Sequence, residues 1–244
     1  MKGNASLYNS YLHDIGRICT DTALGQVGVY AEGSNLRFEG NMFDKIGRLQ
    51  EGEEGCKNKK MYYKNHDHGI YLASTSNVLV ANNIFLNFSA GWAIQMYNGY
   101  KKAVPAKGIQ IVYNTFAFPN PHNFGHIMIS SPGLVNADIQ NNIFYKPNRY
   151  ILSQYGKGNY SNINIDNNLI FDGEVSDSIP SGYNVSTNIL AKEERVFIAP
   201  DSLNFNLSAN SPAKNKGIFL KEVKTDFDGK IRSISAPSLG ALEP

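Results

Sequence analysis

The stretch SNVLVANNIF at residues 76–85 decides the fold, because copies of it recur along the chain. The copies are SNLRFEGNMF at 34–43, GIQIVYNTF at 108–116, ADIQNNIF at 137–144 and INIDNNLI at 163–170. Each copy is a short alternating strand followed by an asparagine, a variable residue and an apolar residue. The key asparagines, at 41, 83, 114, 142 and 168, lie 42, 31, 28 and 26 residues apart. Such self-similarity predicts a repeat architecture.

A second alternating strand precedes each copy, at 28–30, 69–72, 93–96, 126–129 and 150–152. Short strands divided by Asn and Gly corners cannot bury a face alone, so the units must stack as coils around one interior. Asparagine suits the corners because it tolerates the left-handed conformation, and its amide can bond to the next coil. A stacked asparagine ladder explains the 29 asparagines of the chain without invoking chemistry.

These units resemble the right-handed parallel β-helix of the pectate-lyase-like superfamily, with its NNIF corners at 82–85 and 141–144. The resemblance covers residues 5–175 and implies an all-β solenoid, without specifying an activity. A second resemblance, to the closing segment of secreted bacterial β-helix proteins, rests on the sequences FNL at 205–207, SPA at 211–213, DFDGKIR at 226–232 and LGALE at 239–243. Together the two resemblances imply that residues 1–175 form coils, and that residues 176–244 form the final coils and a C-terminal cap of the same domain.

Composition excludes several classes of protein. Only 18% of the 244 residues are charged and the net charge is +2, which is too small to indicate nucleic-acid binding. No apolar run approaches the ~18 residues of a membrane span, so no membrane partner is expected. The N-terminal residues show no signal peptide and already read as the middle of a repeat. We therefore expect that a signal and earlier coils preceded this sequence.

The sequence LHDIGR at 12–17 matches FDKIGR at 43–48, which places Arg17 and Arg48 on neighbouring coils. After these arginines the chain enters two loops, 18–27 with Cys19 and 49–68 with Cys56. Neighbouring loops favour a disulfide between the two cysteines, which indicates a secreted or periplasmic protein. Two free thiols are the alternative. The arginines suit a bound carboxylate or sulfate, and two solvated arginines splayed apart are the alternative.

The loop 57–68 is the densest mixture of cationic and proton-transfer groups. It interleaves Lys57, Lys59, Lys60 and Lys64 with Tyr62 and Tyr63, and it ends in His66-Asp67-His68. Cations beside aromatic rings suit an anionic sugar polymer, whereas a solvated basic loop is the alternative. The two histidines could also reach one zinc ion, but no third ligand is evident, so no metal site is predicted.

The strand after this loop should turn Ile70 and Leu72 inward and Tyr71 outward. The outward row across the coils would be Tyr30, Tyr71, Gln95 and Met128, bordered by Trp92, Tyr97 and His126. Such an exposed aromatic row suits a glycan-binding groove. The alternative is a set of scattered surface aromatics, with Trp92 packed inward.

No Gly-x-Ser-x-Gly elbow, His-Glu-x-x-His motif or phosphate-binding glycine loop is present, and no single β-helix family is matched. The leading hypothesis is a polysaccharide lyase or epimerase acting on a uronate polymer. His66 or His68 would be the base, with Tyr63 as the alternative or the acid. Arg48 and Lys64, or calcium, would neutralise the carboxylate. The predicted substrate-binding residues are Arg17, Lys60, Tyr71, Trp92, Gln95 and His126.

Two other functions stay open at this point. A glycoside hydrolase needs a pair of carboxylates, for which Asp14, Asp44 and Asp67 are the grouped candidates. A glycan-binding or adhesion β-helix, similar to a tailspike module, would use the same groove without a base.

Overall fold

The chain folds almost entirely into β-strands. The computed structural model describes residues 1–22, 24–57, 65–99, 103–121, 125–193 and 195–244. Strand makes up 48% of the structure and helix 3%. The described helical residues form the short 3-10 helices η1 (Glu53–Gly55) and η2 (Pro200–Ser202). The expected all-β class is confirmed.

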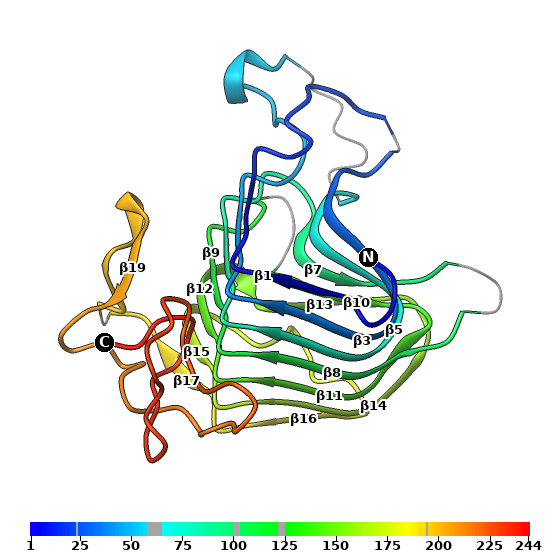
Figure 1. Ribbon diagram of the computed structural model, residues 1–244. Helices are drawn as coiled ribbons and strands as arrows, with labels where there is room; N and C mark the ends of the chain where they lie inside the picture. The colour runs from blue at the N-terminus through cyan, green and yellow to red at the C-terminus, as the bar shows by residue number, and fades with distance from the viewer. Residues whose placement is uncertain (23, 58–64, 100–102, 122–124, 194) are drawn as a thin grey trace.

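Two sheets contain most of the strands, and their described pairings are all parallel (Figure 1). The larger sheet holds β1 (Ser6–Tyr8), β3 (Val27–Glu39), β5 (His68–Ala81), β7 (Trp92–Met96), β8 (Ala106–Val112), β10 (Ile127–Ser130), β11 (Gly133–Gln140), β13 (Leu152–Tyr155), β14 (Asn159–Asp166) and β16 (Tyr183–Ser186). The smaller sheet holds β2 (Tyr11–His13), β4 (Met42–Asp44), β6 (Ile84–Leu86), β9 (Thr115–Ala117), β12 (Ile143–Tyr150), β15 (Leu169–Glu174) and β17 (Ile189–Ala191).

Strand β5 divides the larger sheet into two arms. Its beginning pairs with β7, where Tyr71 lies opposite Gln95, and its end pairs with β8, where Leu79 lies opposite Gln110. Between the two halves, Ser74 adopts a left-handed φ of 49°. The first arm contains the beginnings of β3 and β5 with β7, β10 and β13. The second arm contains the ends of β3 and β5 with β1, β8, β11, β14 and β16.

From β7 onward each coil of the chain contributes one strand to the first arm, then one to the second arm and then one to the smaller sheet. The order is β7–β8–β9, then β10–β11–β12, then β13–β14–β15. Each turn pairs in parallel with the turn before it, for instance β11 with β8 and β14 with β11. This stacking is compatible with a parallel β-helix or a similar solenoid.

The corner asparagines form the predicted ladder. Asn41, Asn83, Asn114, Asn142 and Asn168 are all fully buried. The backbone N–H and the side-chain amide of Asn83 both donate to Oδ1 of Asn114 at 2.9 Å, and Asn114 bonds in the same way to Asn142. The ladder satisfies polar groups that would otherwise be costly to bury.

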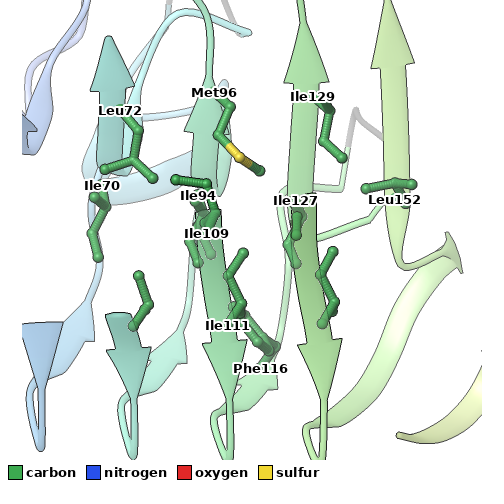
Figure 2. Close-up of a cluster of buried hydrophobic side chains, with 14 of the residues drawn as sticks. Ile70, Leu72, Ile94, Met96, Ile109, Ile111, Phe116, Ile127, Ile129 and Leu152 are labelled. Carbon is green, nitrogen blue, oxygen red and sulfur yellow. The ribbon is translucent and has the colours of Figure 1, made fainter. Parts of the chain in front are cut away.

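Aligned apolar rows fill the interior. Phe43, Phe85, Phe116 and Phe144 stack from one turn to the next, with ring centroids 4.9, 4.9 and 4.8 Å apart. Figure 2 shows the aliphatic rows, which include Ile70, Leu72, Ile94, Met96, Ile127, Ile129 and Leu152. Ile70 and Leu72 face the core as predicted, and Tyr71 is half-buried on the opposite side of β5.

Residues 176–244 contain the last strands of the two sheets, β16 and β17, followed by a segment that packs beside the smaller sheet. After the antiparallel pair β18 (Phe197–Ala199) and β19 (Asn204–Leu207), the chain runs along the outer side of earlier turns (Figure 1). Asn82 donates to the carbonyl of Thr225, and Asn141 donates to that of Ile218. Leu190, in the last strand of the smaller sheet, is 61% exposed. The segment buries the outer face of the smaller sheet.

Candidate functional site

The two loops that the sequence analysis singled out lie side by side. Cys19 and Cys56 form a disulfide with a Cα–Cα distance of 5.4 Å, so the pairing considered from the sequence is the one in the structure. The bond joins the loop after β2 to the loop after β4 and closes 37 residues. Both loops sit next to the start of β5, where His66, Asp67 and His68 are found.

Arg48 is a structural residue, which corrects its assignment as a carboxylate-neutralising group. The side chain is fully buried, and its Nε and Nη2 atoms each donate to Asp67 at 2.8 Å. The remaining guanidinium donors bind the carbonyls of Thr22 and Leu24. This guanidinium is enclosed and all three of its nitrogens donate to protein oxygens, so it has no face left for a substrate. It does hold a carboxylate bidentately, but that carboxylate belongs to the protein.

Arg17 is likewise occupied, so its assignment to substrate binding is also corrected. It forms ion pairs with Glu53 and Glu54, and it donates to the Ser89 hydroxyl at 2.8 Å. Burial lowers the pKa of Arg17, but the hydrogen bonds that its guanidinium donates to Glu53 and Glu54 outweigh this effect and leave that pKa raised. The two arginines are therefore neither solvated nor available to a ligand.

Two of the three histidines assigned to the site belong to the core. His68 and His126 are each 1% exposed. Burial lowers the pKa of each imidazole to about 3, so both are neutral near pH 7 and neither can be reached by a polymer. Nδ1 of His68 accepts a hydrogen bond from the backbone of Trp92, and His126 packs against Phe116. His68 as base and His126 as a substrate contact are corrected.

The grouped carboxylates do not form a hydrolase pair. Asp67 is enclosed with Arg48, and buried Asp44 accepts hydrogen bonds from Tyr11 and Asn87. Asp14 is exposed and bonds to its neighbour His13. Three further predicted residues, Lys60, Tyr63 and Lys64, lie outside the described residues.

The outward row of the first arm has the register that the sequence predicted. Tyr30 pairs with Tyr71, Tyr71 with Gln95, and Gln95 with Met128. The rings of Tyr30 and Tyr71 stack with centroids 5.2 Å apart. Tyr97, just after β7, meets Tyr71 edge to face at 6.5 Å.

A cavity of 560 Å³ lies on this face, and we call it the aromatic groove. Its lining residues come from β7, β10 and β13 and from the chain just before β5. They are Asn65, His66, Trp92, Gln95, Tyr97, Met128, Ser130, Ser153, Gln154 and Tyr155. Among the predicted site residues, the groove thus brings together His66, Trp92 and Gln95. Tyr71 borders it through Gln95 and Tyr97.

The groove offers aromatic surface and hydrogen-bonding groups in one place. Tyr97 is 37% exposed and Tyr155 is 73% exposed, whereas Trp92 is only 7% exposed and stacks on the buried His68. Trp92 therefore packs inward, which corrects its assignment as a substrate-binding ring. Gln95 is 5% exposed, and its Oε1 atom has no hydrogen-bond partner in the part of the chain that the structure describes. An unpaired buried acceptor is costly in a folded protein, which favours a polar ligand or water at this position.

Sequence reasoning missed the polar half of the groove. Ser130 lies at the end of β10, and Ser153, Gln154 and Tyr155 lie on β13. The repeat pattern did contain a signal for these residues, because the outward row continues from Met128 to Ser153 in the next turn. Extending the outward row by one turn would have found these residues.

The chemistry available in the groove centres on His66, the one described imidazole that lines it. Among the described residues, no group of three or more His, Cys, Asp and Glu side chains could hold a metal ion. The aromatic, amide and hydroxyl lining suits a ligand rich in hydroxyl groups and flat apolar faces.

No protein-family model matches the chain, and no curated protein has a significantly similar sequence. None of the described helices has the length and apolar character that crossing a membrane requires.

Proposed function

We propose that the chain is a right-handed parallel β-helix of the pectate-lyase-like type and that it acts on a uronate-containing polysaccharide in the aromatic groove. The observation that carries this proposal is the groove itself, in which the exposed rings of Tyr97 and Tyr155 share one cavity with Gln95 and His66 across three stacked strands. Flat rings receive the apolar faces of pyranose units, and the amides and hydroxyls receive their hydroxyl groups. A groove across stacked strands suits an extended polymer.

The reaction that we propose is eliminative cleavage or epimerisation. Both begin with removal of the proton on the carbon beside the uronate carboxylate. His66 is the proposed base, because it is half-buried at the groove and an imidazole is suited to proton transfer near neutral pH. The developing negative charge on the carboxylate needs a cation to stabilise it. Lys64 stays the candidate for that role, and Lys60 stays a candidate for substrate binding.

A binding module without catalysis is the second candidate function. It is favoured by one observation, namely that the described lining of the aromatic groove contains no lysine, arginine, aspartate or glutamate. A glycoside hydrolase is not proposed, since the three carboxylates that the sequence grouped are separated or enclosed.

We also propose that the protein works in a secreted or periplasmic setting. Its support is the disulfide between Cys19 and Cys56, because such bonds persist in oxidising compartments.

The test is incubation of the protein with pectate, alginate, hyaluronan, chondroitin and heparin. Ultraviolet-absorbing unsaturated ends identify a lyase, and a changed uronate configuration without cleavage identifies an epimerase. Retention on a polymer gel without products identifies the binding module. New reducing ends without ultraviolet absorbance, or no interaction with any of the five polymers, would overturn the proposal.

A further inference from the structure

We infer that Arg149 binds the carboxylate of a uronate unit in a second cavity that continues the aromatic groove. This inference rests on the proposed function and names the charged contact that the described part of the groove lacks. With this contact the site would be an extended one, and it would be selective for anionic over neutral polysaccharides.

The second cavity, which we call the distal cavity, has a volume of 430 Å³ and shares Ser153 and Gln154 with the aromatic groove. Its other lining residues are Arg149, Tyr150, Leu152, Ser176, Asp177, Ser178 and Pro180. The chain beyond β15 continues the stack, because Leu152 donates its backbone N–H to the carbonyl of Val175. Three strand spacings of ~4.8 Å separate β7 from this segment, so the two cavities span roughly 14 Å. That length suits several sugar units.

Arg149 is held in place by its backbone and by an aromatic ring. It has a φ of 88° and lies where the register between β12 and β15 shifts. The guanidinium carbon lies 4.7 Å from the centroid of the Tyr150 ring, and Tyr150 donates a 2.6 Å hydrogen bond to Asp177. The arginine therefore rests on a ring that is itself fixed.

The guanidinium of Arg149 forms no ion pair with a described residue, although Asp177 lines the same cavity. Arg149 is also exposed. The buried arginines contrast with it, since Arg48 is bound to Asp67 and Arg232 to Glu243. Stacking on a ring leaves the edge of a guanidinium free, and that edge matches a carboxylate with two parallel hydrogen bonds.

A substitution of Asp177 distinguishes an anionic ligand from a neutral sugar. Its carboxylate lies in the distal cavity and accepts the hydrogen bond from Tyr150. Toward a uronate it is a repelling charge, so Asp177→Asn should leave affinity unchanged or raise it. Toward a neutral sugar it is an acceptor for hydroxyl groups, so the same substitution should lower affinity.

The experiment measures the affinity of the full chain for hexamers of galacturonate and of alginate by calorimetry, and the tighter hexamer serves as the probe. Arg149→Gln should weaken binding about tenfold or more, as expected for loss of a charged hydrogen bond. The methyl-esterified form of the probe should bind wild type and Arg149→Gln alike. The control is Lys146→Gln on the same strand, where Lys146 also lies over a ring, that of Tyr145. Lys146 lines a neighbouring cavity that Arg149 borders too, but it does not line the distal cavity.

The outcomes separate this inference from the proposed function. If the wild-type chain binds the probe and Arg149→Gln binds it equally well, the inference fails while the proposed function stands. Equal losses in Lys146→Gln and Arg149→Gln would place the anion in the other cavity and also overturn it. A loss of affinity in Asp177→Asn would identify a neutral ligand. If wild type binds neither hexamer, the inference falls together with the proposal for these uronates.

Discussion

Both carboxylate oxygens of Asp67 accept a hydrogen bond from the guanidinium of Arg48, and both side chains are fully buried. The same carboxylate accepts the backbone N–H groups of Arg48 and Gln26 at 2.8 Å. One aspartate therefore joins the loop after β2 to the loop after β4 at the entrance to β5. Because Asp67 directly follows His66, this ion pair also fixes the position of the proposed base at the aromatic groove.

The first prediction is that breaking this pair unfolds the loops that it joins. Arg48→Met leaves the Asp67 carboxylate buried without its partner, so the free energy of unfolding should fall by about 3–5 kcal/mol. Urea unfolding followed by fluorescence measures this change. The double variant Arg48→Met with Asp67→Leu should recover most of the loss, since no uncompensated charge remains. If the single substitution costs no more than the double one, the pair does not have this role.

Much of the fold could be predicted because it is periodic. The inward and outward rows and the asparagine ladder follow from the alternation within each repeat, and the register of Tyr71 with Gln95 came directly from aligning the corners. The alignment also placed Arg17 and Arg48 at equivalent positions correctly. Their partners could not be predicted, because Glu53 and Asp67 lie in a loop that departs from the repeat.

The C-terminal segment escaped prediction for a related reason. Arg232 donates to Asn82 across 150 residues of sequence, and it lies 3.9 Å from the ring centroid of Tyr113. Nothing in the repeat pattern indicates that an outer face needs such a cover. The outward positions of the smaller sheet, such as Ile84 and Leu169, are apolar and were the available signal.

The second prediction concerns the asparagine ladder. In Asn114→Ala the buried backbone N–H of Asn83 loses its acceptor, and the carbonyl of Val80 loses its donor. An unsatisfied buried polar group costs about 1–3 kcal/mol, so the melting temperature should drop clearly. The control is Asn184→Ala, because Asn184 is exposed and its amide bonds only to the side chain of Asn164 among the described residues. Equal melting temperatures for the two variants would refute a structural role for the buried ladder.

The third prediction concerns the disulfide. Alkylation of the folded protein without reductant should label neither Cys19 nor Cys56, as mass spectrometry would show. Replacing both cysteines by serine should lower the free energy of unfolding by about 2–4 kcal/mol, because the unfolded chain regains the freedom of a closed loop. Labelling of both thiols before reduction would exclude the bond and remove the support for an oxidising compartment.

The fourth prediction is a loss of stability in acid caused by the buried histidines. The folded-state pKa of His126 is lowered to about 3 by burial, whereas the unfolded chain has an ordinary value near 6.5. Between these values only the unfolded state takes up the proton, so stability falls as the pH drops from about 6.5 toward 3, by about 1.4 kcal/mol per pH unit for each such histidine.

The variant His126→Leu should flatten this dependence, because it removes one of the two groups. Urea unfolding between pH 6 and pH 4 gives the slope for each protein. His13→Gln is the control, since His13 is exposed and its side chain bonds to Asp14. A slope in His126→Leu equal to that of wild type would show that the imidazole already carries its proton in the folded protein.

The last prediction separates the two histidines on either side of Asp67. His66 lines the aromatic groove, so His66→Ala should lower kcat on the cleaved uronate polymer by roughly 10²–10⁴-fold, as for loss of a general base, while the affinity for the polymer stays near that of wild type. His68 stacks on Trp92 inside the protein, with ring centroids 5.9 Å apart, so His68→Ala should lower the melting temperature first. Any loss of activity in His68→Ala should follow the fraction of unfolded protein, which circular dichroism at the assay temperature measures. A folded His66→Ala that cleaves at the wild-type rate would move the base elsewhere on the chain, because no other described imidazole lines the groove.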